Sequence, residues 1–152
     1  MVRAIGSVVL GYVVMAVAVF ATFSVAYLLL GADGSFKPGT YDVSTLWLVV
    51  SIVLSFGAAV LGGFVCAAVA KRSKPPKVLA AIVLVLGLAL AMPTLTGGDG
   101  DPMPRPDDVD NVEAMQNAVQ PLWITLLNPL IGAAGVLVGA RRRKNETGVP
   151  IM

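Results

Sequence analysis

The polar residues that could do chemistry within an apolar segment are few, and one group stands out. Asn128 and Pro129 lie inside a long apolar run, and Thr125 precedes them by about one helical turn. A proline leaves the carbonyl four residues earlier without its helical donor, and the Thr125 hydroxyl or the Asn128 amide could replace that donor. This polar kink predicts a hinge or a binding site for a small polar group. The alternative, which we favour, is a packing kink satisfied by neighbouring helices.

A second group of side chains with potential chemistry is acidic. Six carboxylates fall between residues 99 and 113, namely Asp99, Asp101, Asp107, Asp108, Asp110 and Glu113. Carboxylate oxygens are ligands that calcium prefers, but the fixed glycine and terminal glutamate of a calcium-binding loop are missing. We therefore predict a solvated acidic loop and no metal site.

Residue types that carry most enzyme chemistry are sparse. The chain has no histidine, which excludes imidazole-ligated haem and histidine-based zinc or iron sites. Its single cysteine, Cys66, cannot form an intrachain disulfide. Ser24, Ser51 and Ser55 have no histidine or lysine beside them in the sequence to act as a base. We predict no catalytic residues and no cofactor, and we expect that the chain is not an enzyme.

The elements that must position these residues are membrane helices. The 152 residues are 57% hydrophobic and 13% charged, well below the roughly 25% charge of soluble domains. Four runs without a charged side chain predict four spans, at residues 4–31, 44–70, 78–95 and 121–140. The first run is too long for the apolar core of a signal peptide, so we interpret it as a retained span. The prediction is an all-α, four-helix up-and-down bundle forming a single membrane domain over residues 1–152.

Small residues predict where these spans touch. The second span carries a ridge at every fourth position, formed by Ser51, Ser55, Ala59, Gly63 and Ala67. Such a ridge lets another helix approach closely. We expect it to meet one face of the first span, which collects Ser7, Gly11, Ala18, Thr22 and Ala26. In the fourth span, Gly135 and Gly139 form a GxxxG arrangement that predicts another close contact with an unspecified partner.

Charge is distributed unevenly between the ends of the spans. Basic residues follow the second and the fourth span: Lys71, Arg72, Lys74 and Lys77, then Arg141, Arg142, Arg143 and Lys144. The positive-inside rule places the loop 71–77, the tail 141–152 and both termini in the cytoplasm. Loops 32–43 and 96–120 then lie outside, with Trp47 and Trp123 as anchors at the membrane interface. We expect the inner membrane of a bacterium, with membrane lipids as neighbours.

A short surface helix is predicted before the fourth span. Asp110 and Glu113 have the spacing of a capping box. One helical face then collects apolar residues, namely Val112, Met115, Val119 and Leu122. This pattern is typical of a helix lying on the outer surface.

The two halves of the chain contain a possible internal sequence repeat. A shift of 66 residues aligns Gly31-Ala32-Asp33-Gly34 with Gly97-Gly98-Asp99-Gly100, Pro38 with Pro104, and Asp42-Val43 with Asp108-Val109. Two interpretations stay open: a duplicated helical hairpin, or a chance match among residues that loops favour.

Function is constrained mainly by what the four runs lack. Ion-coupled transporters normally keep a charged residue or histidine within their spans, and these runs have neither. There is also no basic stripe that would indicate nucleic-acid binding. We expect a non-enzymatic accessory or interaction subunit that forms a homo-oligomer or joins a larger membrane complex. The alternative is a small homo-oligomeric transporter or channel for a neutral or lipophilic solute, with Thr125, Asn128 and Pro129 lining its path.

Overall fold

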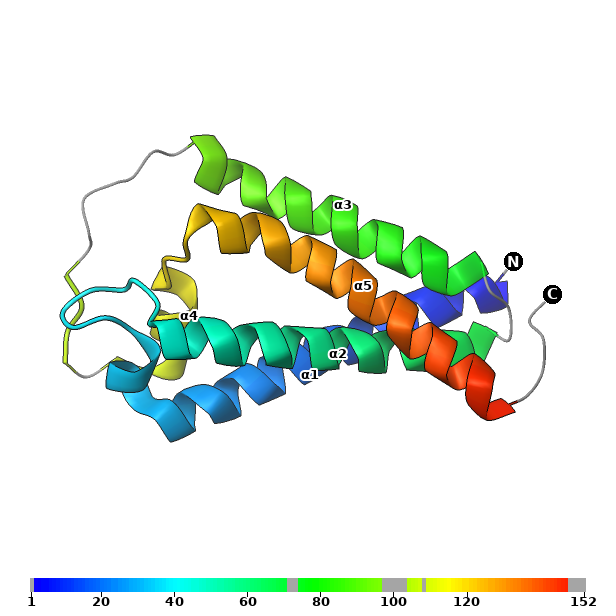
Figure 1. Ribbon diagram of the computed structural model, residues 1–152, viewed down its shortest axis with the longest axis horizontal. Helices are drawn as coiled ribbons and strands as arrows, with labels where there is room; N and C mark the ends of the chain where they lie inside the picture. Colours follow the sequence, from blue (N-terminus) through cyan, green and yellow to red (C-terminus); the bar gives the residue numbers. More distant parts are fainter. Residues whose placement is uncertain (1, 71–73, 97–103, 108, 148–152) are drawn as a thin grey trace.

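The fold is a bundle of long helices with a small cap at one end (Figure 1). The computed structural model describes residues 2–70, 74–96, 104–107 and 109–147. In these ranges the chain forms five helices: α1 (Val2–Ser35), α2 (Thr45–Ala70), α3 (Lys74–Thr96), α4 (Asn111–Asn117) and α5 (Leu122–Thr147). Four of them, all but α4, are long and apolar enough to cross a membrane. The predicted all-α fold with four spans is confirmed.

The long helices alternate in direction, so the start of α1 and the end of α5 lie at the same end of the bundle (Figure 1). Helix α2 packs against both α1 and α5, and α3 packs chiefly against α5. The chain therefore consists of two antiparallel pairs, α1 with α2 and α3 with α5, which the contact between α2 and α5 joins. The second copy of the possible internal repeat begins at residues 97–100, outside the described residues, so a duplicated hairpin stays a prediction.

Helix boundaries follow the positions of glycine and proline. Gly31 interrupts α1 with φ 66° and ψ −179°, a conformation essentially restricted to glycine, and it coincides with the predicted end of the first span. The third helix begins at Lys74 rather than Val78, because Pro75 and Pro76 occupy a first turn whose N–H groups have no intrahelical acceptor. The predicted cytoplasmic loop is therefore shorter than residues 71–77. The predicted tail also begins as helix, because α5 continues to Thr147.

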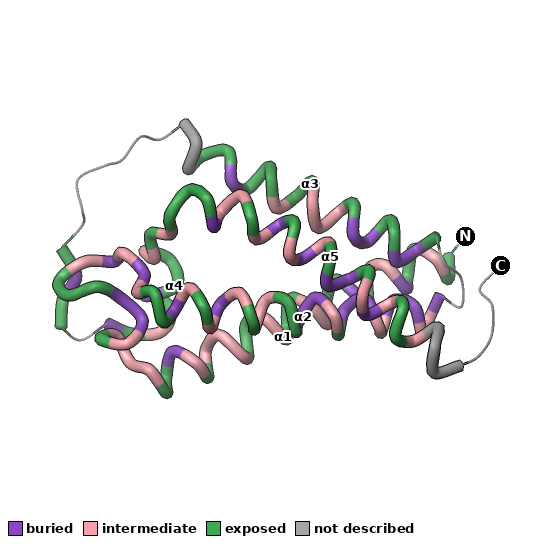
Figure 2. Tube along the Cα trace, viewed as in Figure 1, coloured by how far each residue is buried: buried purple, intermediate pink, exposed green. Residues whose placement is uncertain are grey.

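Buried residues gather at two levels of the bundle (Figure 2). One cluster lies where the long helices converge, toward the end that carries the termini, and contains Ala59, Cys66, Leu79, Ala80 and Val136. The other lies at the opposite end and contains Tyr27, Phe36, Tyr41, Val43, Trp47, Val109 and Ala114. The second cluster is the core of a segment formed by residues 32–44, 104–107 and 109–119. We call it the outer cap, after the side of the membrane that the sequence predicts for it.

Main-chain hydrogen bonds hold the outer cap together. The Val43 amide donates to the Val119 carbonyl at 3.1 Å, and the Val119 amide donates to the Tyr41 carbonyl at 2.9 Å. The Arg105 amide donates to the Gly39 carbonyl at 3.0 Å. The loop after α1 is thereby paired with the loop before α5. The described part of the acidic segment is therefore paired with another loop, while its Asp107 and Asp110 side chains are exposed to solvent, as predicted.

The predicted surface helix is present as α4, which packs against α1 at the end of the bundle opposite the termini (Figure 1). Asp110 is its N-cap, with a carboxylate oxygen that accepts from the Val112 amide at 2.7 Å and the Glu113 amide at 2.9 Å. The Glu113 carboxylate accepts from the Tyr41 hydroxyl at 2.7 Å. Ala114 lies on the side of α4 that faces the interior and is buried. Val112, which belongs to the predicted apolar face, is exposed.

Candidate functional site

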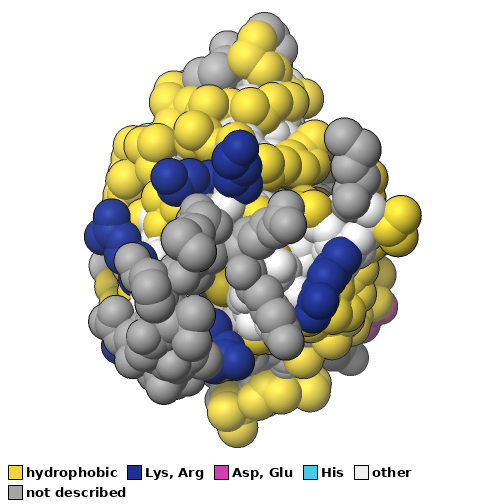
Figure 3. All heavy atoms as spheres, turned by 90° about the vertical axis from the view of Figure 1, so that its right-hand side faces the viewer, with side chains coloured by type: hydrophobic (Ala, Val, Ile, Leu, Met, Phe, Trp, Pro, Cys, Tyr) yellow, Lys and Arg dark blue, Asp and Glu magenta, His cyan; other side chains and the backbone are white. Residues whose placement is uncertain are grey.

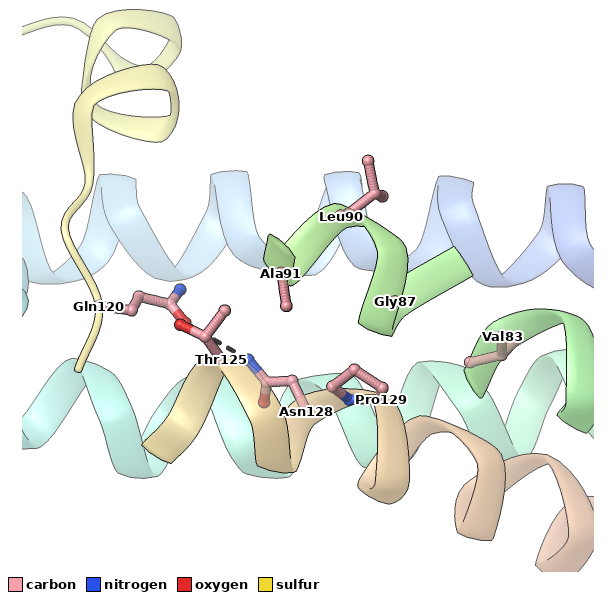
Figure 4. A pocket seen from close by; sticks show the side chains of 8 residues that line it. All are labelled: Val83, Gly87, Leu90, Ala91, Gln120, Thr125, Asn128 and Pro129. Atoms are coloured by element: carbon pink, nitrogen blue, oxygen red, sulfur yellow. Dashed lines mark hydrogen bonds between the residues drawn. The ribbon is translucent and has the colours of Figure 1, made fainter. Parts of the chain in front are cut away.

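The polar kink of α5 lines a cavity between α3 and α5 (Figure 4). The cavity has a volume of about 290 Å³. Thr125, Asn128 and Pro129 contribute its α5 side and Gln120 closes one end; the remaining lining residues are Val83, Gly87, Leu90 and Ala91 of α3. The three residues singled out in the sequence therefore share one site with four residues of a different helix.

A close contact between the two helices sets one edge of this cavity. A Cβ atom added at Gly87 would lie 2.7 Å from Cγ of Pro129, and one added at Gly132 would lie 2.9 Å from Cγ1 of Val83. The proline ring therefore packs where α3 has no side chain. Pro129 has a packing role, and the space beside this contact forms the cavity.

The hydrogen bonds of the site differ from those expected. The Asn128 amide nitrogen donates to Gln120 Oε1 at 3.3 Å, and the Thr125 hydroxyl donates to the Pro121 carbonyl at 3.3 Å. Neither bond involves the Thr125 carbonyl, which we expected one of these two side chains to satisfy. Asn128 Oδ1 is buried and has no hydrogen-bond partner among the described residues.

The depth and charge of the site limit what it can hold. Asn128 lies six residues after the start of α5 at Leu122, or about 9 Å along the helix at 1.5 Å per residue. The site therefore lies in the half of the span that is nearer the outer cap. All eight lining residues are uncharged. The arrangement offers hydrogen bonding to a neutral group and no general acid, base or nucleophile pair.

The sequence pattern did not single out Gln120 or the α3 wall of the cavity. Gln120 lies just before Pro121, outside the fourth apolar run. Gly87 and Ala91 have the four-residue spacing of small residues that allows close helix approach. That spacing was the available signal for the α3 side of the cavity.

The two predicted small-residue motifs face each other. A Cβ atom added at Gly63 would lie 2.6 Å from Cα of Val136 and would also meet its carbonyl oxygen. One added at Gly135 would lie 2.7 Å from Cβ of Ala59, and one added at Gly139 would meet the carbonyl oxygen of Val60. The ridge residues Ser51, Ala59, Gly63 and Ala67 are buried, and Ser55 is half-buried. Helices α2 and α5 thus touch backbone to backbone.

The first helix meets α2 on a neighbouring face, which corrects the expected pairing. A Cβ atom added at Gly11 would lie 2.7 Å from Cβ of Cys66 and 2.9 Å from the carbonyl oxygen of Gly62. Gly62 and Cys66 each precede a ridge residue by one position, so they lie about 100° around the helix from the ridge. Helix α2 therefore has two adjacent faces of small residues, one packed against α1 and one against α5.

The two tryptophans occupy different environments. Trp123, at the start of α5, is 58% exposed, as a side chain in contact with the membrane interface would be. Trp47 is only 7% exposed and lies edge-on to Phe23 at 5.8 Å and to Tyr27 at 6.3 Å between ring centroids. Its ring is therefore part of the cap core, because the outer end of α1 covers it.

Basic side chains lie around the end of the bundle that carries the termini (Figure 3). The described members on the helices are Arg3, Lys74, Lys77, Arg141, Arg142 and Arg143. Arg3 Nε donates to the Val69 carbonyl at 3.0 Å, which satisfies a carbonyl in the last turn of α2. Lys71, Arg72 and the side chain of Lys144 fall outside the described residues.

Asp33 and Glu113 of the outer cap have structural partners. Asp33 lies 3.3 Å from the Arg105 guanidinium, whose side chain is 4% exposed. The hydrogen bond to Glu113, together with burial, raises the pKa of Tyr41. Within the described ranges no three His, Cys, Asp or Glu side chains form a group that could hold a metal ion. Asp99, Asp101 and Asp108 lie outside those ranges.

Comparisons of the chain with models of protein families, with curated proteins and with solved structures found no match. A fold class by itself does not specify function, because one architecture carries many activities. The function is therefore argued from the surfaces and the cavity of this bundle.

Proposed function

We propose that the chain is a non-enzymatic membrane component that packs with copies of itself or within a larger membrane complex. The observation that supports this proposal is the exposure of α1. Only 6% of the residues in its most apolar stretch are fully buried within the chain, compared with 28% in α2 and α3 and 33% in α5. A span with so few fully buried residues leaves the side that faces away from α2 open to lipid or to another helix.

The exposed surface of α1 includes a place for close helix approach. Its large exposed side chains include Val9, Val13, Val17 and Phe20. A Cβ atom added at Gly6 would meet nothing within 4 Å, whereas Gly11 on the other side of the helix is filled by α2. Membrane helices associate through small residues of this kind. The open side of α1 is thus the surface that we assign to a partner helix.

Native purification in a mild detergent tests this proposal. We expect a particle larger than one chain, formed by copies of this chain or by co-purifying membrane proteins. Gly6→Leu should shift the particle toward the monomer without lowering its thermal stability, because the new side chain enters open space. Gly57→Leu is the matched control, since Gly57 on α2 also has nothing within 4 Å. A strictly monomeric wild-type chain without a partner would contradict the proposal.

The cavity between α3 and α5 favours a second candidate, a small homo-oligomeric transporter or channel for a neutral or lipophilic solute. Its polar side chains, Gln120, Thr125 and Asn128, are the kind that line a solute path in a membrane. Reconstitution into liposomes and measurement of solute efflux test it. An efflux rate that is unaffected by Asn128→Leu would exclude a path through this cavity.

For localisation, we propose the inner membrane of a bacterium with both termini in the cytoplasm. The support is the unequal distribution of basic side chains. Six of those described lie at the end that carries the termini, whereas the outer cap holds only Lys37 and Arg105, together with Asp33, Asp42, Asp107, Asp110 and Glu113. Cysteine labelling tests it in a Cys66→Ala background. Asp107→Cys should react with an impermeant reagent in intact cells, and Lys77→Cys only after permeabilisation. The reverse pattern would invert the orientation.

A further inference from the structure

The apolar face predicted for α4 and the residues after it is exposed rather than packed against the bundle. Val112 is 56% exposed, Met115 36%, Val119 52% and Leu122 47%. We propose that this face lies in lipid, in the leaflet on the side of the outer cap, where it contacts the acyl chains of phospholipids. The proposal holds whichever side of the membrane the cap faces. It also needs no partner protein or solute, so it is independent of the functions proposed above.

Contacts with α1 determine how deep α4 lies. Asn111 Nδ2 donates to Ser24 Oγ at 2.9 Å, and the Tyr27 hydroxyl donates to the Val109 carbonyl at 2.7 Å. Ser24 follows Arg3 by 21 residues, which is about 32 Å along a helix at 1.5 Å per residue. The hydrocarbon core of a bilayer is about 30 Å thick. With Arg3 at one boundary of this core, Ser24 lies at the other boundary or inside it, because any tilt of α1 shortens the distance it covers across the membrane.

The other long helices indicate the same level. Helix α5 has no charged side chain from Leu122 to Ala140, and these residues cover about 28 Å at 1.5 Å per residue. Its start therefore also marks a boundary of the hydrocarbon core. Figure 1 shows α4 running across the bundle axis, level with the first turn of α2. A helix at this level and in this direction lies in the interfacial region, where amphipathic helices bury one face in lipid.

Two hydrogen bonds at α4 show which of its sides faces the membrane. Asn111 and Glu113 lie about 160° apart around the helix at 100° per residue. Asn111 bonds to Ser24 within a span, so its side of α4 faces the hydrocarbon. Glu113 accepts from the Tyr41 hydroxyl within the cap, so its side faces the water. The depth of any other side chain on α4 follows from its angle to these two.

The exposed side chains of α4 are sorted by polarity along this direction. Met115 lies about 40° from Asn111 and thus on the membrane side, whereas Gln116 lies about 60° from Glu113 and thus on the water side. Both are exposed. Val112 lies between them, nearly opposite the buried Ala114, and points away from the bundle. A thioether toward hydrocarbon and an amide toward water is the order that an interfacial helix requires.

The same surface continues along the chain into a span. Val119 and Leu122 are followed by Trp123, which is 58% exposed. Tryptophan favours the level between the head groups and the hydrocarbon. The exposed apolar side chains therefore lead from α4 to the lipid-facing start of α5, which is why we assign lipid rather than a protein to this surface.

Collision accessibility of spin labels in phosphatidylcholine liposomes tests the proposal. Single cysteines replace Met115 or Gln116 in a Cys66→Ala background and carry a nitroxide. Oxygen concentrates in hydrocarbon, whereas a nickel chelate stays in water. We expect Met115→Cys to respond mainly to oxygen and Gln116→Cys mainly to the chelate. Val17→Cys, at a residue 62% exposed within α1, is the lipid reference, and Lys37→Cys, with a side chain 62% exposed in the cap, is the water reference.

The accessibility pattern separates the possible environments of this face. A response of Met115→Cys like that of Lys37→Cys would place it in water and overturn the proposal. Little response to either reagent would mean that protein covers it, which also overturns the proposal. Equal responses at Met115→Cys and Gln116→Cys would refute the orientation of α4.

A matched pair of charge variants provides a second measurement. Met115→Glu and Gln116→Glu add the same carboxylate at neighbouring exposed positions. We expect Met115→Glu to lower the melting temperature of the chain in nanodiscs and Gln116→Glu to leave it nearly unchanged, because only the first carboxylate would lose its hydration in lipid. Equal shifts for the two variants would contradict the placement of Met115 in lipid.

Discussion

Replacement of Gly63 by alanine should strongly destabilise the bundle, although it adds a single methyl group. The new Cβ atom would lie 2.6 Å from Cα of Val136 and 2.7 Å from its carbonyl carbon. These are backbone atoms, so they cannot rotate away as the end of a flexible side chain can. Overpacking typically costs about 1–3 kcal/mol. We expect about 2–3 kcal/mol here, a factor of roughly 30–150 in the unfolding equilibrium.

The assay is reversible unfolding of the purified chain in mixed detergent micelles, followed by circular dichroism. Two matched controls separate the contact from general sensitivity of α2. Gly57→Ala adds the same methyl where nothing lies within 4 Å, and Leu61→Ile changes a side chain that is 54% exposed. Both should be almost silent. An equally small effect of Gly63→Ala would show that the ridge of α2 does not pack against α5.

A double variant distinguishes the atoms involved. Val136→Ala removes side-chain methyl groups of the residue facing Gly63 but leaves its Cα and carbonyl in place. It should therefore fail to rescue Gly63→Ala. Recovery of more than about half of the lost stability in the double variant would indicate a side-chain contact, and the backbone-to-backbone packing argued above would be wrong.

Three further predictions concern other parts of the bundle. Gly87→Ala should destabilise by about 1–3 kcal/mol in the same assay, because its Cβ atom would lie 2.7 Å from the Pro129 ring, whereas Gly6→Ala should not. Gly31→Ala should cost about 1–3 kcal/mol, because φ is 66° there. For Tyr41, whose folded-state pKa is raised, the associated stability is present below its unfolded pKa near 10 and is lost as the pH rises through the folded value. Tyr41→Phe should remove that alkaline loss, and an unchanged pH profile would contradict the link.

The spans could be predicted from the sequence because lipid imposes one strong condition, a run without charge long enough to cross the membrane. The surface helix could also be predicted, because its start depends on a local interaction between Asp110 and the amides two and three residues later. Both features need only neighbouring residues. No long-range contact has to be known for either.

Features that depend on distant segments could not be predicted. Gly62 and Gly63 are adjacent and both small, so the sequence did not determine which face of α2 meets α1 and which meets α5. The burial of Trp47 depends on Phe23 and Tyr27 of another helix. The cavity was predicted only on its α5 side, because its other wall is α3. Small residues allow many close pairings, and the chain's three-dimensional arrangement selects among them.

The main-chain hydrogen bonds of the outer cap have a consequence for the order of biosynthesis. Val119 donates to Tyr41 and accepts from Val43, so it links a segment made late to one made early. Chains are synthesised from the N-terminus, so α1 and α2 have both been made before Val119 emerges. Until then Tyr41 and Val43 lack these partners. The cap therefore closes only after the segment before α5 has reached the same side of the membrane, which makes its closure a late step in insertion.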